Sequence, residues 1–353
     1  MEVRTLNGLH KFRNQRYIDT TGISTYYLEE YAGKGLRELI AYYSNRLSYN
    51  DLSGLLKRIL GKSPYSVRHL QHKVVAESGL ISSYLQSVQS PLQLSLNFVE
   101  QVDIYASQTE ELVYLDDGVG VKRQKETRGE EKALASEKLA TVQTDVIVIG
   151  NLSNGYQYLS SAEANFSNIS LEDLIHLKLS KNYADKPLPL VAITDGAQSI
   201  RCRLRRLFGM YVVVLLDWYH LAKKIRQYAS RLNLNKAEKE KHTEKMLAYL
   251  WLGQTQEALI YSDKMIKTSQ NKTLEDLQNY LFKHQQEICN YAKRQTLGKT
   301  IGSGRGEKAN DQLVANRQKK KAMSWSVKGS NALAILKTLE VNQQWAKYWA
   351  MAA

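Results

Sequence analysis

Residues 190–229, LVAITDGAQSIRCRLRRLFGMYVVVLLDWYHLAKKIRQYA, carry a strand–helix–strand–helix pattern. The apolar run at 190–193 is typical of a strand covered on both faces, and Gly196 permits the turn that follows it. A basic helix then ends at Gly209, and the apolar run at 211–216 predicts a second buried strand. This alternation predicts an α/β sheet with its strands buried between helices.

An aspartate stands at the end of each of these two strands. Asp195 follows the first strand, and Asp217 follows the second, where Asp217-Trp218-Tyr219-His220 leads into another helix. Active sites of open α/β sheets gather at the carboxyl edge of the strands. Both acids are therefore candidate site residues.

The rest of the sheet is expected earlier in the chain. Apolar runs at 111–115, 119–124 and 145–149 predict three strands, and residues 171–179 predict a helix. The first three strands lie close in sequence and favour an antiparallel meander, with a tight connection at Gly118, whereas the later ones alternate with helices and favour parallel pairing. This is the order of the RNase H-like fold, so we predict an RNase H-like mixed α/β sheet with flanking helices.

Further segments are expected around this core. A polar helical stretch interrupts the α/β pattern late in the chain and predicts an inserted helical subdomain. The expected organisation is a β-rich and shortened N-terminal segment at 1–34, a helix-turn-helix region at 35–85, a connector at 86–110, the first part of the core at 111–234, the helical insertion at 235–297, and the C-terminal part of the core at 298–353.

The helix-turn-helix prediction rests on residues 36–77. A helix capped at Ser48 is broken at residues 61–64, and another helix begins near Ser66. Helix, glycine-bearing turn and basic helix is the pattern of proteins that read the major groove, although an ordinary three-helix module with a solvated charged face shares it. The third helix is expected to turn Val67, Leu70 and Val74 inward and to present Arg68, His69, Gln71, His72 and Lys73 to DNA.

Composition supports a polyanionic partner. The 353 residues include 49 Lys and Arg against 35 Asp and Glu, a formal net charge of +14. Such an excess favours nucleic acid, although a merely soluble basic protein is the alternative. Cys202 and Cys289 form no metal-ligand spacing, and no segment approaches the length of a membrane span, so we expect no membrane association and a place in the cytoplasm, at the nucleoid.

Three acids from remote segments suit phosphodiester chemistry. Two divalent cations about 4 Å apart activate the attacking oxygen and stabilise the leaving one, and Mg²⁺ prefers oxygen ligands. The candidates are Asp117, Asp195 and Glu307. Asp116 competes with Asp117, since strand alternation puts the two on opposite faces; we prefer Asp117 because it adjoins Gly118.

The late motif makes a resemblance specific. The chain resembles DDE transposases of bacterial insertion sequences, of the Lre-type and Kra-type group. Residues 194–197 and 217–220 are similar to the middle motifs of that group, and residues 8–75 to the region before its catalytic core. The most specific match is IGSGRGE at 301–307 followed by Asn310, Arg317, Lys319, MSWS at 323–326 and Gly329.

The resemblance implies an activity and a set of site residues. It implies strand cleavage and strand transfer at insertion-sequence ends, with two Mg²⁺ ions, replaceable by Mn²⁺, held by Asp117, Asp195 and Glu307. Asp217 and His220 match a supporting motif. The implied partners are double-stranded DNA of the element ends and target, and further copies of the chain on that DNA. The residues expected to neutralise DNA phosphates are Arg305, Lys308, Arg317, Lys319, Lys320 and Lys321.

Two features keep other functions open. The chain begins almost directly on the matching region, and Gly306 weakens the start of the helix that carries Glu307. An inactive remnant that only binds DNA is therefore one alternative. A cellular RNase H-like nuclease is the other.

Overall fold

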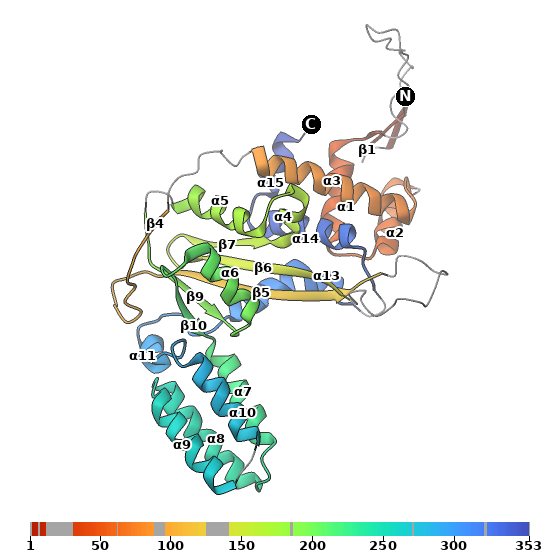
Figure 1. Cartoon of the computed structure of the whole chain (residues 1–353). Helices are drawn as coiled ribbons and strands as arrows, with labels where there is room; N and C mark the ends of the chain where they lie inside the picture. Colours follow the sequence, from red (N-terminus) through yellow and green to blue (C-terminus); the bar gives the residue numbers. More distant parts are fainter. Residues whose placement is uncertain are drawn as a thin grey trace, which may run out of the picture.

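The computed structural model describes residues 2–5, 8–11, 31–61, 63–87, 96–124, 141–183, 186–269, 272–320 and 323–352. Its centre is a five-stranded mixed sheet in the order β10-β9-β5-β6-β7 (Figure 1). The first three strands in sequence form an antiparallel meander, and the last two join in parallel beside the first. The strands are β5 (Leu112–Lys122), β6 (Thr141–Asn151), β7 (Gly155–Ser160), β9 (Leu190–Thr194) and β10 (Val213–Leu216).

The meander forms as predicted, but from different segments. The runs at 111–115 and 119–124 belong to one strand, β5, and Gly118 pairs with Asp145 of β6, so the predicted tight connection at Gly118 is wrong. The third strand is β7, which carries few apolar residues and was not predicted. Pairing of β5 along its whole length with β6 outweighs the turn preference of an Asp-Gly pair, because it satisfies the backbone groups of both strands.

Alternate residues of β5 enter two different cores, as strand geometry requires. Leu112 and Tyr114 pack with residues of β6 and of helices α5 (Leu171–Tyr183) and α6 (Gln198–Phe208). Val113 and Leu115 enter the larger core on the other face. Three C-terminal elements contribute to that core: α12 (Gly304–Asn310), the π-helical turn η1 (Asp311–Ala315) and α14 (Val327–Val341); the short α13 (Asn316–Gln318) follows η1.

The N-terminal helices pack on the larger core through α14. Helix α3 lies along α14, and α1 and α2 pack against α3 (Figure 1). Gly61 ends α2 in the left-handed region at φ 76°, which glycine adopts readily. The elements are α1 (Lys34–Ser44), α2 (Tyr49–Leu60), α3 (Val67–Ser87), the short strands β1 (Glu2–Thr5), β2 (Gly8–Lys11) and β3 (Tyr31–Ala32), the pair β4 (Asn97–Phe98) and β8 (Pro187–Leu188), and the helices α4 (Ser161–Ser167) and α15 (Trp345–Met351).

The polar helical stretch forms a bundle that projects from the sheet beyond β10 (Figure 1). Asn235 and Glu238 start its first inserted helix with a reciprocal capping box. Within the described residues, no helix combines the length and the apolar character needed to cross a membrane. The bundle contains α7 (Trp218–Ser230), α8 (Lys236–Trp251), α9 (Thr255–Ser269) and α10 (Lys272–His284), and is followed by α11 (Tyr291–Thr296).

Candidate functional site

Strand register brings Asp117 and Asp195 together. Parallel pairing of β5 with β9 runs as far as Leu115 opposite Ile193. Asp117 lies two residues after Leu115 and is still on β5. Asp195 lies two residues after Ile193, just past the end of β9. Both acids therefore stand at the carboxyl edge of the parallel part of the sheet, where the sequence predicted a site.

The turn that carries Asp195 rests on the inserted bundle. Gly196 has φ 86°, and a Cβ atom there would lie 2.7 Å from Cε1 of the buried His284. His284 Nδ1 is 2.6 Å from Glu287 Oε2, and the other oxygen of Glu287 is 2.7 Å from Nε of Arg201. Only glycine fits both the backbone angle and the space, so the bundle fixes the position of Asp195.

Helix α12 brings the third acid to the same edge. The buried Gly306 faces Leu115 of β5, with 3.5 Å between Leu115 Cβ and the position of a Cβ on Gly306. The next residue, Glu307, points outward, and its side chain is 59% exposed. A small residue before Glu307 therefore fits between the helix and the strand, and a Cβ there would be in ordinary contact with Leu115.

Asp117 is the centre of the cluster. Its Oδ2 accepts a hydrogen bond from Asn310 Nδ2 at 2.6 Å, and its Oδ1 accepts from the Gly118 N–H at 2.8 Å. Partial burial raises the pKa of Asp117 above its ordinary value, and the charges of Asp195 and Glu307 raise it further, against the Gly118 N–H and nearby His220. Repulsion among these carboxylates would be relieved by a cation.

Asp116 lies on the other side of the sheet and joins neither Asp195 nor Glu307. It is 4% exposed, and its oxygens accept from Arg203 Nη1 at 2.9 and 2.8 Å and from the Tyr114 hydroxyl at 3.1 Å. Burial raises the pKa of Asp116 to about 6, although the Arg203 guanidinium opposes the shift. Between the two competing acids, the geometry therefore associates Asp117 with the cluster, and Asp116 ties α6 to the sheet.

Asp217 ties the late glycine-rich loop to α7. Its Oδ1 accepts from the backbone N–H of Tyr219 and His220, which caps α7, and its Oδ2 accepts from the N–H (2.6 Å) and hydroxyl of Ser303. These hydrogen bonds, with His220, outweigh burial and lower the pKa of Asp217 to about 2. A 1% exposed carboxylate with all these donors is a structural anchor for the loop that precedes α12.

His220 connects that anchor with the acid cluster. Its Nδ1 lies 3.3 Å from Asp217 Oδ2, and its Nε2 lies 3.8 Å from Glu307 Oε1. Contact with Asp217 raises the pKa of His220, and Glu307 and Asp195 add to the effect against partial burial. His220 therefore supplies positive charge to the edge of the cluster when protonated.

The predicted DNA-binding side chains fall into two groups. On α3, Leu70 and Val74 are buried and Val67 is partly buried, as predicted, while Lys73 is only partly exposed. Gln71 and His72 line a cleft against the core instead of an open groove-facing surface. Arg68, His69, Gln71 and His72 are all exposed to solvent, the last two at the rim of this cleft.

The C-terminal basic residues differ among themselves. The Arg305 guanidinium lies 3.8 Å from the centre of the Tyr156 ring, a cation–π contact beside the acid cluster. Arg317 is only 5% exposed, so it does not belong to a solvated basic face. Lys308, Lys319 and Lys320 are exposed, and Lys321 lies outside the described residues.

The side chains of the acid cluster offer oxygen donors for a divalent cation. Among the described residues, no group of three or more His, Cys, Asp or Glu side chains is placed to hold a metal ion. Mg²⁺, however, is commonly bound by one or two carboxylates, with water and substrate phosphate as its other ligands. The clustered carboxylates and the buried Asn310 Oδ1, which has no hydrogen-bond partner in the described chain, supply hard oxygen donors of the right kind. The chemistry of the donors therefore fits, without a complete protein coordination shell.

Sequence reasoning gave no site role to three polar residues that hold this site, although Ser303 and Asn310 stand in the late motif. Asn310 stands three residues after Glu307 on a helix, a spacing that puts both on one face and would have indicated it. The hydrogen-bond partners of Ser303 and Arg203 are 86 and 87 residues away in the chain, so no local spacing indicated what these two side chains hold.

Comparison with protein-family models finds no match for this chain. Comparison with curated proteins finds none either.

Proposed function

We propose that this chain is a DDE-type transposase with an RNase H-like core, cutting and joining DNA strands at the ends of an insertion sequence. The observation that carries the proposal is that Asp195 and Glu307, from segments up to 190 residues apart, both lie near enough to Asp117 for their charges to raise its pKa. The strand order β7-β6-β5-β9-β10, an antiparallel meander extended by two parallel strands, agrees with this fold. The net charge of +14 agrees with a DNA partner.

In this proposal the three carboxylates hold divalent cations, Mg²⁺ or Mn²⁺. Such cations, when bound, activate the attacking oxygen and stabilise the leaving oxygen of a phosphodiester. Asn310 holds Oδ2 of Asp117 in place by its hydrogen bond, and Gly196 holds the Asp195 turn against the bundle. Because these supports are built into helices and strands, the carboxylates need little reorganisation during the reaction.

In this proposal the supporting residues position Glu307, offset its negative charge and bind DNA phosphates. Asp217 fixes Ser303 at the start of α12, and thereby the position of Glu307 four residues later. His220 faces Glu307 and offsets part of the negative charge there. Arg305, Lys308, Lys319 and Lys320 would bind phosphates of the DNA strands, with further copies of the chain joining two DNA ends.

A DNA-binding protein without catalysis is the second candidate. One observation favours it: no complete set of three metal-holding side chains is found in the described part of the chain. On this alternative the acid cluster has lost its cation, and the helix-turn-helix region α2–α3 retains DNA binding.

Replacement of Asp195 by Asn tests the proposal. The substrate is an end-labelled duplex made from the DNA that flanks the gene, incubated with Mg²⁺ or Mn²⁺ and, for strand joining, with a supercoiled target plasmid. We expect Asp195→Asn to abolish cleavage and joining while DNA binding in a mobility-shift assay stays unchanged.

Three results would contradict or redirect the proposal. Equal loss of binding and cleavage in Asp195→Asn would remove the support for a metal role. Wild-type protein that binds but never cuts would favour the non-catalytic candidate. Cleavage without strand joining would instead identify a nuclease.

A further inference from the structure

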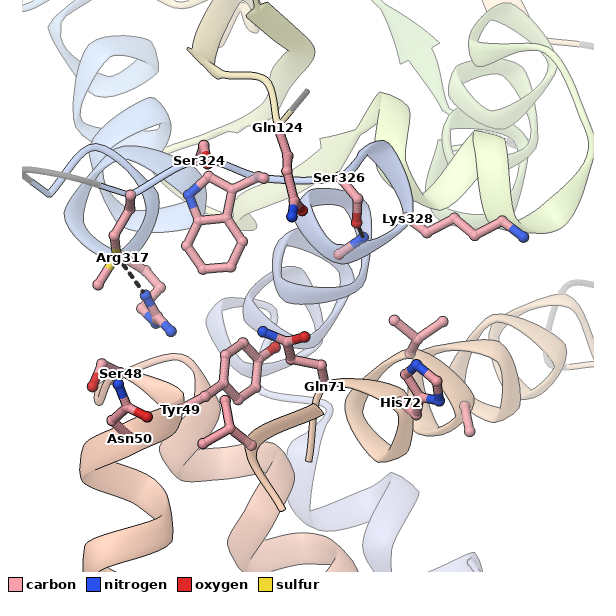
Figure 2. Close-up of a pocket in the computed structure, with 16 residues that line it drawn as sticks. Ser48, Tyr49, Asn50, Gln71, His72, Gln124, Arg317, Ser324, Ser326 and Lys328 are labelled. Carbon is pink, nitrogen blue, oxygen red and sulfur yellow. Dashed lines mark hydrogen bonds between the residues drawn. The ribbon is translucent and has the colours of Figure 1, made fainter. Parts of the chain in front are cut away.

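A cleft of about 750 Å³ lies between the helix-turn-helix region and the core, away from the acid cluster (Figure 2). One wall comes from the start of α2 and the N-terminal half of α3, and the other from residues 323–329 and from Gln124, two residues beyond the end of β5. Figure 2 shows side chains of both walls converging on it, Arg317 from the core and Gln71 from α3. Nothing in the acid cluster accounts for this cleft.

The cleft contains a buried positive charge without a counter-ion. Arg317 is 95% buried, and no Asp or Glu in the described chain forms an ion pair with it. Its Nε donates to the Ser44 carbonyl at 2.7 Å, and Nη1 contacts the Met323 sulfur at 3.2 Å. A buried guanidinium in such surroundings is costly, and burial lowers the pKa of Arg317 accordingly. An anion in the cleft would remove that cost.

The walls of the cleft prepare it for an anion. The Arg317 guanidinium lies 4.9 Å from the Trp325 ring centre and 5.6 Å from that of Tyr49, which hold it in position. The N-termini of α2 and α14, 12 and 15 residues long, both contribute to the lining, so their dipoles favour negative charge there. Lys328 and His72 line it as well. Asp51 is the opposing charge, and it is exposed, with its Oδ2 accepting from the Ser48 hydroxyl.

We propose that this cleft binds a backbone phosphate of the DNA substrate, with Arg317 as its central ligand. Arg317 follows Glu307 by ten residues along one continuous helical path through α12, η1 and α13. That separation is about 15 Å at 1.5 Å per residue, or about four base-pair steps at 3.4 Å each. The cleft would thus hold a DNA strand a few nucleotides from the reacting phosphate and join the helix-turn-helix region to the core through the substrate. The inference rests on the proposed function for its choice of DNA.

Two charge variants and one control test the inference. Arg317→Gln and Lys328→Gln each remove a charge from the cleft, and Lys236→Gln removes one from an exposed position on α8. DNA affinity is measured by fluorescence anisotropy between about 50 and about 300 mM salt. Over this range the affinity falls with salt at a slope that reports the number of phosphate contacts. We expect Arg317→Gln to bind at least about tenfold more weakly, and the slope of log affinity against log salt to fall by about 0.9. Lys328→Gln should show the same fall in slope with a smaller loss of affinity, and Lys236→Gln should match wild type.

Lys328→Gln keeps the test valid if Arg317→Gln fails to fold, because Lys328 is exposed on the surface of α14. Wild-type affinity and slope in Lys328→Gln, and in folded Arg317→Gln, would overturn the proposal. Inorganic phosphate separates the two sources of the anion. A raised melting temperature in phosphate, together with DNA binding that is indifferent to both variants, would show a small-ion site and reject the DNA assignment. DNA binding is measured without divalent cations, so it does not depend on catalysis. An absence of cleavage would therefore refute the proposed function without changing the outcome of the binding test.

Discussion

The two faces of β5 carry neighbouring aspartates with opposite environments. Asp116 is buried against α6 and compensated by Arg203, which also reaches Asp145 at 2.6 Å. Asp117, one residue on, meets the charges of two further carboxylates and only one side-chain hydrogen-bond donor, Asn310. A strand that alternates its side chains can therefore serve stability on one face and accumulate negative charge on the other.

The difference between the two aspartates suggests that a site can be recognised by negative charge that no neighbouring cation offsets. Arg203 Nη1 donates to both oxygens of Asp116 and offsets part of the cost of burying this charge, although burial still raises the pKa of Asp116 to about 6. Within the described chain, the repulsion between Asp117 and the other two carboxylates is not offset by an arginine; His220, when protonated, offsets part of it. Asp117 is half-buried and Asp195 and Glu307 are exposed, so solvent screens part of their repulsion; a cluster of like charges at a sheet edge is nevertheless a candidate site for a ligand of opposite sign.

Exchanging each aspartate for asparagine gives the largest expected contrast. Asp116→Asn leaves the partly buried Arg203 with Asp145 as its remaining charged partner, and we expect it to lower the free energy of unfolding by about 1–3 kcal/mol. Asp117→Asn removes one of several repelling charges, so its stability should equal or slightly exceed that of wild type while strand cleavage is lost. Urea unfolding at pH 7 and the cleavage assay measure the two effects.

The opposite pattern would reverse the assignment of the two faces. If Asp116→Asn stopped cleavage in a fully folded protein and Asp117→Asn retained it, Asp116 would be the functional acid. Each variant serves as the matched control of the other, since both make the same chemical change in adjacent residues.

Asp217 is an intermediate case, a buried acid compensated by hydrogen bonds at the margin of the site. Its folded pKa of about 2 lies below the ordinary value of 3.8, so its charge stabilises the protein fully above about pH 4 and this contribution is lost as pH falls toward 2. We expect Asp217→Asn to cost about 2 kcal/mol at pH 7. In urea unfolding across this range, the difference from wild type should shrink between pH 4 and 2; a difference independent of pH would rule out the charge of Asp217 as its source.

Local patterns in the sequence identified the strands at 190–193 and 211–216, the inward face of α3 and the edge that carries Asp195. They failed where distant partners decide the structure. Gly118 resembled a turn residue but lies within β5, because β6 pairs across it, and β7 has a polar sequence that only its place beside β6 makes a strand. Arg317 resembled part of a solvated basic run, yet the packing of α1 and Trp325 around it buries it.

Substitution of Gly306 has the smallest expected effect. The sequence suggested that this glycine weakens the start of the helix that carries Glu307, whereas in the structure the glycine packs against Leu115 of β5. A Cβ at this position would meet Leu115 at 3.5 Å, an ordinary contact distance, and alanine favours helices over glycine by about 1 kcal/mol. We therefore expect Gly306→Ala to raise the free energy of unfolding by less than about 1 kcal/mol and to leave cleavage intact, as thermal unfolding and the cleavage assay would show. Gly306→Leu would press further toward Leu115 of β5 and should displace α12, so that cleavage falls while far-UV circular dichroism shows that the other helices are preserved. If Gly306→Ala alone abolished cleavage without loss of stability, the close contact of α12 with β5 would not be what positions Glu307, and glycine would be needed there for backbone freedom.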